Sequence, residues 1–190
     1  PLEDKKITIS RLNISVTYPC NFIFIASMNP CPCGNYGSQD KECTCKPQQI
    51  KNYLNKISGP LLDRIDLHIE VEGIEYKKFE SSKKEESSKE IRNRVNLARK
   101  IQIERYKNEN IYSNSELTPK LMEKYCKIDE RGKRILEKAF ENLKLSARAY
   151  TRILKVSRTI ADLENSKNIQ SKHIIEAVQY RSLDRKYWGR

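Results

Sequence analysis

Four cysteines lie close together in one short stretch of this chain. Cys31 and Cys33 form one Cys-x-Cys pair, and Cys43 and Cys45 form a second pair after nine intervening residues. Two thiol pairs on a folded-back loop suit tetrahedral Zn²⁺, whereas an exported disulfide framework normally spreads its cysteines along a small chain. Because zinc sites more often use Cys-x₂-Cys spacing, reduced free thiols and a labile disulfide are the alternatives. We predict a metal site formed by these four residues.

The positive charge of the chain is confined to its second part. The net charge is +12, yet residues 1–75 hold 8 Lys/Arg and 9 Asp/Glu, whereas residues 76–190 hold 29 and 16. A polyanion such as nucleic acid is one partner that would suit this surface; solvated, lysine-rich helix faces are the other explanation. No apolar run reaches the roughly 18 residues of a membrane span, and no signal-peptide pattern begins the chain. We therefore expect a cytoplasmic protein without a membrane partner.

The first part of the chain reads as sheet-forming. Alternating residues at 7–10 and 14–17 predict a hairpin. The apolar, β-rich run 21–28 is typical of a strand buried on both faces of a parallel sheet, and it stops at a proline. A helix is predicted over 47–57, where Pro47 suits the first turn, and a further strand over 67–71. These elements surround a cysteine-rich loop at 30–47.

The second part of the chain reads as helical. A Ser/Lys/Glu stretch without apolar residues precedes it. Helical periodicity begins near Glu90 and predicts helices over 116–126, 130–142 and 146–164, with a last helix capped by Ser171. The predicted organisation is 1–75, a linker at 76–89, and an all-helical domain at 90–190.

Four motifs occur in one order along the chain. Met28-Asn-Pro30 ends the apolar run, and Gly59-Pro-Leu-Leu-Asp-Arg-Ile-Asp-Leu-His68 follows the cysteine loop. Leu145-Ser-Ala-Arg-Ala-Tyr150 opens a long helix. With the cysteine run, they resemble the magnesium-chelatase-like AAA+ ATPases of the ComM/YifB family. The resemblance implies an α/β fragment of an AAA+ core followed by an all-α helical lid.

The resemblance also assigns roles to single residues. Asn29 would be the sensor that orients the attacking water, Arg64 the arginine finger given to a neighbouring subunit, and Arg148 the sensor of the lid. A side-chain amide orients water without adding charge, and a guanidinium matches phosphate oxygens. Each has a plainer explanation: an Asx turn before proline for Asn29, an ion pair with Asp63 or Asp66 for Arg64, and ordinary exposure for Arg148, as for Arg152 and Arg158.

One departure from the family concerns ATP itself. The chain has no Gly-x-x-x-x-Gly-Lys-Ser/Thr motif and no apolar run ending in paired acids. We therefore expect a longer parent protein that hydrolyses ATP with Mg²⁺, and a fragment that is inactive alone.

Three functions follow from this reading. The first is a DNA-remodelling motor, of helicase or branch-migration type, that assembles as a ring, expected to be a hexamer. In related helicases the hairpin before the sensor strand contacts DNA in the pore, which makes Arg11 a candidate phosphate contact; a solvated turn residue is the alternative. The second is a chelatase-type subunit that remodels a protein partner, and the third a stand-alone zinc-dependent DNA-binding module.

Overall fold

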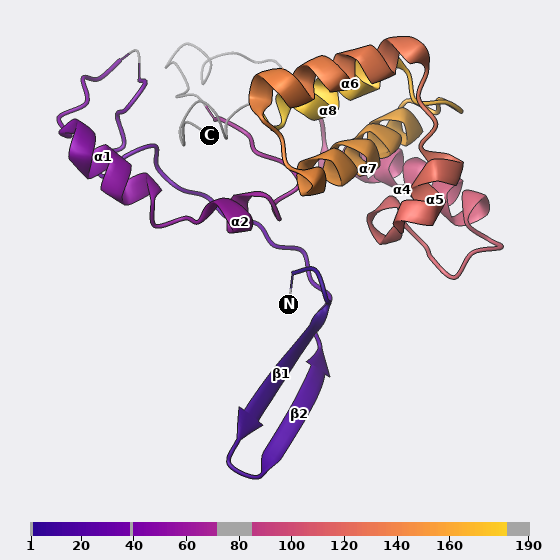
Figure 1. The fold of residues 1–190 in the computed structure, drawn as a ribbon. Coiled ribbons are helices and arrows are strands. Elements are labelled where there is room, and N and C mark those ends of the chain that lie inside the picture. Colours follow the sequence, from indigo (N-terminus) through magenta and orange to yellow (C-terminus); the bar gives the residue numbers. More distant parts are fainter. Residues whose placement is uncertain (1, 39, 72–84, 182–190) are drawn as a thin grey trace. The chain divides into compact units, whose positions relative to one another are not determined.

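The computed structural model describes residues 2–38, 40–71 and 85–181 and divides the chain into two compact units, Pro1–Arg64 and Ile65–Arg190 (Figure 1). Within the described residues the protein is mostly helical and has one two-stranded sheet. None of the described helices is long and apolar enough to cross a membrane. The domain boundary near residue 76 stays a prediction, and most of the linker at 76–89 lies outside the described residues.

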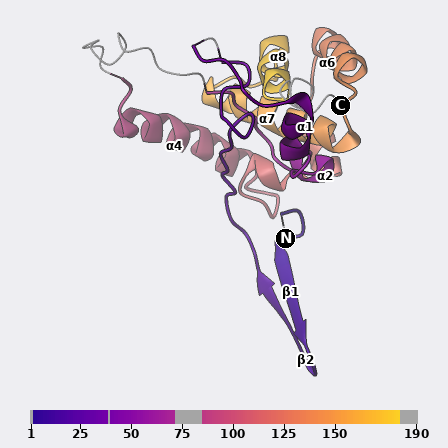
Figure 2. The ribbon, with the colours of Figure 1, turned by 90° about the vertical axis from the view of Figure 1, so that its left-hand side faces the viewer.

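The first unit begins with the predicted hairpin, which is confirmed. β1 (Lys6–Arg11) and β2 (Ile14–Pro19) pair antiparallel, with Ile9 opposite Val16, and the two strands run side by side in both views (Figures 1 and 2). Successive side chains of a β-strand point to opposite faces of the sheet. One face therefore carries the apolar residues, and the other carries serine and threonine pairs such as Thr8 and Thr17, whose hydroxyl oxygens lie 2.9 Å apart.

The strands predicted over 21–28 and 67–71 do not form. Neither segment is paired with a strand in the described part of the chain, and Ile23 and Ile25 are each 88% exposed. A strand buried on both faces requires ladder partners on both edges, and apolar sequence alone cannot supply them. The two predicted strands, and the parallel sheet expected around residues 21–28, are therefore wrong for this structure.

Two short helices complete the first unit. α1 (Pro47–Leu54) begins at the predicted proline and ends three residues earlier than expected. α2 (Gly59–Leu62) follows, with the Ser58 hydroxyl accepting a hydrogen bond from the N–H of Leu61. Leu54 and Leu62 are buried, which anchors each helix by its last residue.

The second unit is a helical assembly whose elements agree with the predicted ones within a few residues. They are α4 (Ser88–Arg105), the 3₁₀ turn η1 (Asn114–Glu116), α5 (Pro119–Tyr125), α6 (Glu130–Leu143), α7 (Ala147–Leu163) and α8 (Ser171–Gln179). Ser171 was expected to cap the last helix, but it is the first helical residue, and Gln170 is the cap.

α7 is the central helix of this unit. It packs against α8, α4, η1 and α5, and Figure 1 shows α8, α4 and α5 around it. Of its apolar side chains, those of Ala149, Ile153 and Ile160 are buried, while that of Leu163 is 40% exposed. α4 contributes to the core through its second half, because Ala98 is buried and Ile91 is 42% exposed. Residues 88–97 of this helix are exposed in the structure.

Candidate functional site

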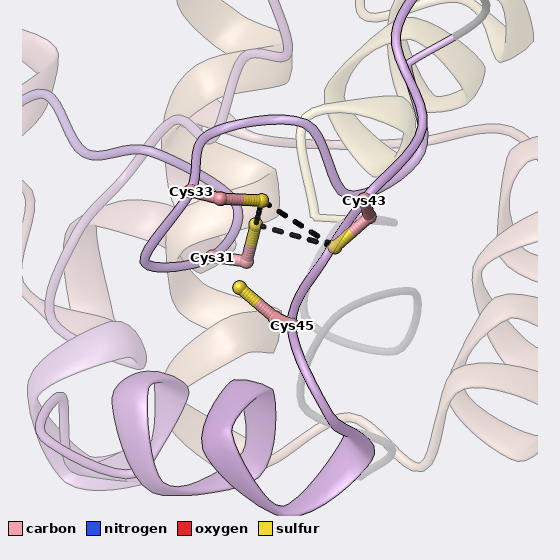
Figure 3. A group of neighbouring side chains, drawn as sticks. All are labelled: Cys31, Cys33, Cys43 and Cys45. Atoms are coloured by element: carbon pink, nitrogen blue, oxygen red, sulfur yellow. Dashed lines mark hydrogen bonds between the residues drawn. The ribbon is translucent and has the colours of Figure 1, made fainter.

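The four predicted cysteines come together in the first unit. Their Sγ atoms all lie within 4.8 Å of one another. Figure 3 shows Cys31 and Cys33 on one arm of the loop, facing Cys43 and Cys45 on the arm that leads into α1. Cys31 is fully buried, and the other three are partly or fully exposed. The loop therefore directs two sequence-distant thiol pairs toward one point.

The spacing of the sulfur atoms fits a single small metal ion. The Sγ of Cys31 lies 3.3 Å from that of Cys33 and 3.7 Å from that of Cys43, and the Cys33–Cys43 distance is 3.6 Å. Four thiolates at about 2.3 Å from a tetrahedral Zn²⁺ are about 3.8 Å apart. None of the four cysteines is joined in a disulfide in the structure. The group could hold a metal ion.

Backbone turns bring the first pair into place. The N–H of Gly34 donates to the carbonyl oxygen of Cys31 at 3.0 Å, and Gly34 adopts φ +85°. This left-handed conformation is strained for residues that carry a Cβ. A Cβ at Gly34 would also lie 3.8 Å from the side-chain nitrogen of Asn29. The turn that positions the thiols therefore lies close to the side-chain amide of Asn29, which the family resemblance assigns as the sensor.

The thiols of the cluster have unequal proton affinities. A hydrogen bond from the backbone of Asn35, followed by one from Cys31, lowers the pKa of Cys33 to about 5. The backbone of Cys45 stabilises the thiolate of Cys43, but partial desolvation and the neighbouring thiols outweigh it and raise the pKa of Cys43 to about 12. Hydrogen bonds between the thiols contribute to both shifts, because the side chain of Cys31 lowers the pKa of Cys33 and raises that of Cys43. A dication held by the four cysteines would require their thiolate forms.

Arg64 follows α2 directly and is held from two sides. Its Nη1 donates to the carbonyl oxygen of Pro60 at 2.8 Å, and its Nε lies 3.2 Å from a carboxylate oxygen of Glu3. Its side chain is 29% exposed. The plainer explanation named Asp63 or Asp66 as its ion-pair partner, but Glu3 is its partner and Asp66 pairs with Arg152 instead.

The other predicted residues lie on separate elements. Arg148 is exposed in the first turn of α7, as expected, and belongs to the second unit. Asn29 is exposed and belongs to the first unit with Arg64 and Arg11. Arg11 ends β1 at the tip of the hairpin, where Leu12 has φ 48° and is fully exposed.

Sequence reasoning missed two arginines of the second unit. Arg158 was regarded as exposed, but it is 2% exposed and forms an ion pair with Asp162. Arg152 was regarded in the same way, but its side chain is 20% exposed and lies 2.8 Å from the carboxylate of Asp66. The i,i+4 spacing of Arg158 and Asp162 is the one local signal that could have indicated the first pair. No sequence signal indicates the second.

Comparison with known proteins identifies the family. Residues 1–79 match the family described as magnesium chelatase, subunit ChlI, and residues 85–181 match magnesium chelatase, subunit ChlI C-terminal. The competence protein ComM of Haemophilus influenzae is 44% identical over 186 residues, covering 97% of this chain and 35% of that protein. YifB of Salmonella typhimurium is 41% identical over 189 residues, 97% of this chain and 36% of its own length.

A more distant relative extends the same pattern. An uncharacterized protein of Mycobacterium tuberculosis is 32% identical over 181 residues, which cover 95% of this chain and 35% of that protein. The chain thus spans about a third of the length of the curated relatives it matches. Because the match covers nearly all of this chain, including both units, the chain belongs to the magnesium-chelatase-like AAA+ family, in the branch that includes ComM and YifB.

Proposed function

We propose that this chain is part of a ring-forming AAA+ ATPase that remodels DNA, with ATP and Mg²⁺ bound in a longer protein that also contains a phosphate loop. In this proposal Asn29, Arg64 and Arg148 serve nucleotide hydrolysis, Arg11 contacts DNA, and the cysteine group holds a structural Zn²⁺. Family membership supports the ATPase class. An arginine donated between subunits requires that each nucleotide site have a neighbouring subunit, and a closed ring meets this requirement. We expect the ring to be a hexamer.

The contacts and exposure of Arg64 are the observation that supports this proposal most directly. Its guanidinium donates a hydrogen bond to the Pro60 carbonyl, and its ionic partner within residues 2–38, 40–71 and 85–181, Glu3, is a third exposed. An ion pair of this exposure contributes only about 0–1 kcal/mol. A phosphate oxygen of a neighbouring subunit's nucleotide can therefore replace Glu3 at little cost. A structural arginine would instead be buried among permanent partners, as Arg158 is.

The reaction needs positioning and charge neutralisation. A water molecule attacks the γ-phosphorus, the bond to the β–γ bridging oxygen breaks, and ADP and phosphate leave. The Asn29 amide would orient that water, and Arg64 would neutralise the negative charge that gathers on the transferring group. Arg148 would contact the nucleotide from the lid. Zn²⁺, when bound by the four thiolates, supplies cross-linking of the loop and no step of the hydrolysis.

The proposed DNA contact rests on the shape and charge of the hairpin. Arg11 lies at its tip, on the face of the ladder that carries Ile9 and Val16. The hydroxyl oxygens of Ser10 and Ser15, 2.9 Å apart, lie on the opposite face. Guanidinium and hydroxyl groups both serve as phosphate contacts. Arg11→Ala should reduce DNA stimulation of ATP turnover and leave turnover without DNA within twofold. The chelatase-type alternative predicts no DNA stimulation at all.

The proposal is tested by Arg64→Ala in the full-length protein. We expect nucleotide affinity within twofold of the wild type and turnover lowered by about 10³-fold, the effect of losing such an arginine. Arg94→Ala is the matched control, because Arg94 is an exposed arginine paired with Glu86. Mixing Arg64→Ala subunits with subunits whose own phosphate loop is disabled should restore turnover. Normal turnover of the pure Arg64→Ala protein refutes the assignment.

A further inference from the structure

One side of α4 carries positive charge and no negative charge. At 3.6 residues per turn, positions 89, 92, 96, 99 and 100 lie within about a third of the helix circumference. The residues at these positions are all exposed, and we call them the cationic face of α4: Lys89, Arg92, Asn96, Arg99 and Lys100. Four cations and a neutral amide thus share a surface on which the sequence places no acid.

The acids of α4 are engaged elsewhere. Glu90 accepts hydrogen bonds from the N–H and the hydroxyl of Ser87, both at 2.7 Å, where the helix begins. Glu104 pairs with Lys107, which follows the last turn, at 2.6 Å. Neither carboxylate therefore neutralises the cationic face.

The cations themselves lack acidic partners in the part of the chain that the structure describes. Residues 2–38, 40–71 and 85–181 supply no carboxylate within ion-pair distance of Lys89, Arg92 or Lys100. Arg99 donates to the side-chain oxygen of Gln102 at 3.3 Å, and this neutral partner leaves the charge of the guanidinium in place. The positive potential of the cationic face is therefore directed to solvent.

α6 has similar exposed cations in a different arrangement. Its Lys133 pairs with Glu130 at 2.6 Å. Along the same side of the helix, acidic and basic residues follow one another at spacings of three or four: Glu130, Lys133, Arg134, Glu137, Lys138 and Glu141. Opposite charges at these spacings compensate each other. α6 thus has the mixed charge of an ordinary solvated helix, whereas α4 concentrates one sign of charge.

The first half of α4 is accessible as well as charged. Residues 88–97 are exposed, and in Figure 2 the beginning of α4 projects past α7. A helix with its side chains is about 10–12 Å across, and the major groove of DNA is about 12 Å wide. The helix rises about 16 Å from Lys89 to Lys100. Cations spread over this length can contact several phosphates along a groove.

A different side of α4 is suited to contact with protein. Ile91 and Val95 continue the line of the buried Ala98 toward the beginning of the helix, and they are 42% and 45% exposed. Their spacing of three or four residues places all three on one apolar stripe. Further protein packed on this stripe would leave the cationic face open.

We infer that the cationic face of α4 binds the phosphate backbone of duplex DNA, with the beginning of the helix at the major groove. The inference adds a binding site in the helical unit to the hairpin contact of Arg11, and it rests on the proposed function for the choice of DNA as partner. Each cation that neutralises a phosphate releases a counterion, so the affinity depends steeply on salt. The Asn96 amide, between these cations, can donate to a phosphate or to a base edge.

The test measures binding of a fluorescently labelled DNA duplex to full-length protein, by anisotropy, with a non-hydrolysable ATP analogue present. The α4 variant combines Lys89→Gln, Arg92→Gln and Lys100→Gln, because glutamine is a good helix former without charge. Its affinity should be at least about tenfold lower at 0.1 M salt. The slope of log affinity against log salt should become shallower by about 2–3, since each lost phosphate contact removes about 0.9.

The matched control removes the same number of charges from α6. Lys133→Gln, Arg134→Gln and Lys138→Gln together change exposed cations of the same unit that have acidic neighbours. This variant should bind the duplex within twofold of the wild type, with a slope changed by less than one. Thermal unfolding and the size of the assembly should match the wild type for both variants.

The outcomes separate this inference from the function on which it rests. If the wild-type protein does not bind the duplex, the DNA partner of the proposed function fails. If the wild type binds but the α4 variant binds equally well, or both variants lose the same affinity, the α4 site is refuted and the proposed function stands. Loss of assembly by the α4 variant, or displacement of the duplex by polyglutamate at equal charge, refutes the site as well.

Discussion

Asp162 is the buried carboxylate on which the helical unit is expected to depend most. Its side chain is fully buried, and Arg105 reaches both of its oxygens, with one N–O distance of 2.8 Å. Arg158 lies 3.0 Å from Oδ1, and the side-chain amide of Asn114 donates to Oδ2 at 2.9 Å. Burial lowers the pKa of Arg158. One carboxylate thus balances the positive charges of two largely buried guanidinium groups.

Asp162→Ala leaves both cations without that compensation. Breaking a buried ion pair by removing one partner costs about 3–5 kcal/mol. Arg158 retains hydrogen bonds to the carbonyl oxygens of Ser166 at 2.6 Å and Lys167 at 3.0 Å, so we expect the lower half of that range. The free energy of unfolding of a whole domain is only about 5–15 kcal/mol. At about 4–8 °C per kcal/mol for a domain of this size, the melting temperature should fall by at least roughly 12 °C.

Urea unfolding followed by far-UV circular dichroism measures this effect, because most of the helix lies in the second unit. Glu130→Ala is the matched control: it removes a carboxylate from an exposed pair with Lys133 and should cost about 0–1 kcal/mol. Asp162→Asn, which keeps the shape and removes the charge, should fall between the two. A loss below about 1 kcal/mol for Asp162→Ala would show that the two arginines do not need the carboxylate, and the reasoning would be refuted.

Three further predictions concern the thiols and the core. Protein purified without chelator should contain about one equivalent of zinc by elemental analysis; Cys45→Ser should lower this content and Cys126→Ala should not, whereas metal-free wild-type protein with an ordered loop would contradict the site. Gly34→Ala should weaken zinc binding several-fold in a chelator competition, because a Cβ at φ +85° costs about 1–2 kcal/mol; unchanged affinity would mean that the turn does not position the thiols. Burial raises the pKa of Cys126 to about 11 and that of Tyr106 to about 12, so both groups ionise first in the unfolded chain. Stability should therefore be level up to about pH 9 and fall as the pH rises toward 12, and a flat melting profile over that range would contradict their burial.

The helices could be predicted because their signals are local. Pro47 and Pro119 begin α1 and α5, where a missing N–H and a fixed φ suit the first turn. Ser146 accepts a hydrogen bond from the N–H of Ala149 at the beginning of α7. The cysteine group could be predicted for the same reason, since four thiols within fifteen residues can meet through turns of one loop.

The failures involve interactions with residues far away in sequence. The run 21–28 has strand-like composition, but a strand is defined by its neighbours, and the described residues provide none for it. Arginine is a residue type usually found at the surface, yet Arg158 is buried because it pairs with Asp162. Asp162 is also bound by Arg105, which lies 57 residues earlier in the sequence. The Asp66–Arg152 pair likewise joins two segments that no local pattern connects.

The two units differ in what can hold them in shape. In residues 2–38 and 40–64 the buried apolar side chains are Cys31, Leu54 and Leu62, whereas the core of the second unit brings together residues from five helices. Small structures with so little buried apolar surface usually need a metal or disulfides for their order. Because Cys31 is itself one of these three, a Zn²⁺ bound to it would join the most buried point of the first unit to the chain entering α1. Removal of zinc should therefore release order in residues 30–47 and leave the helical unit folded, as amide exchange would detect.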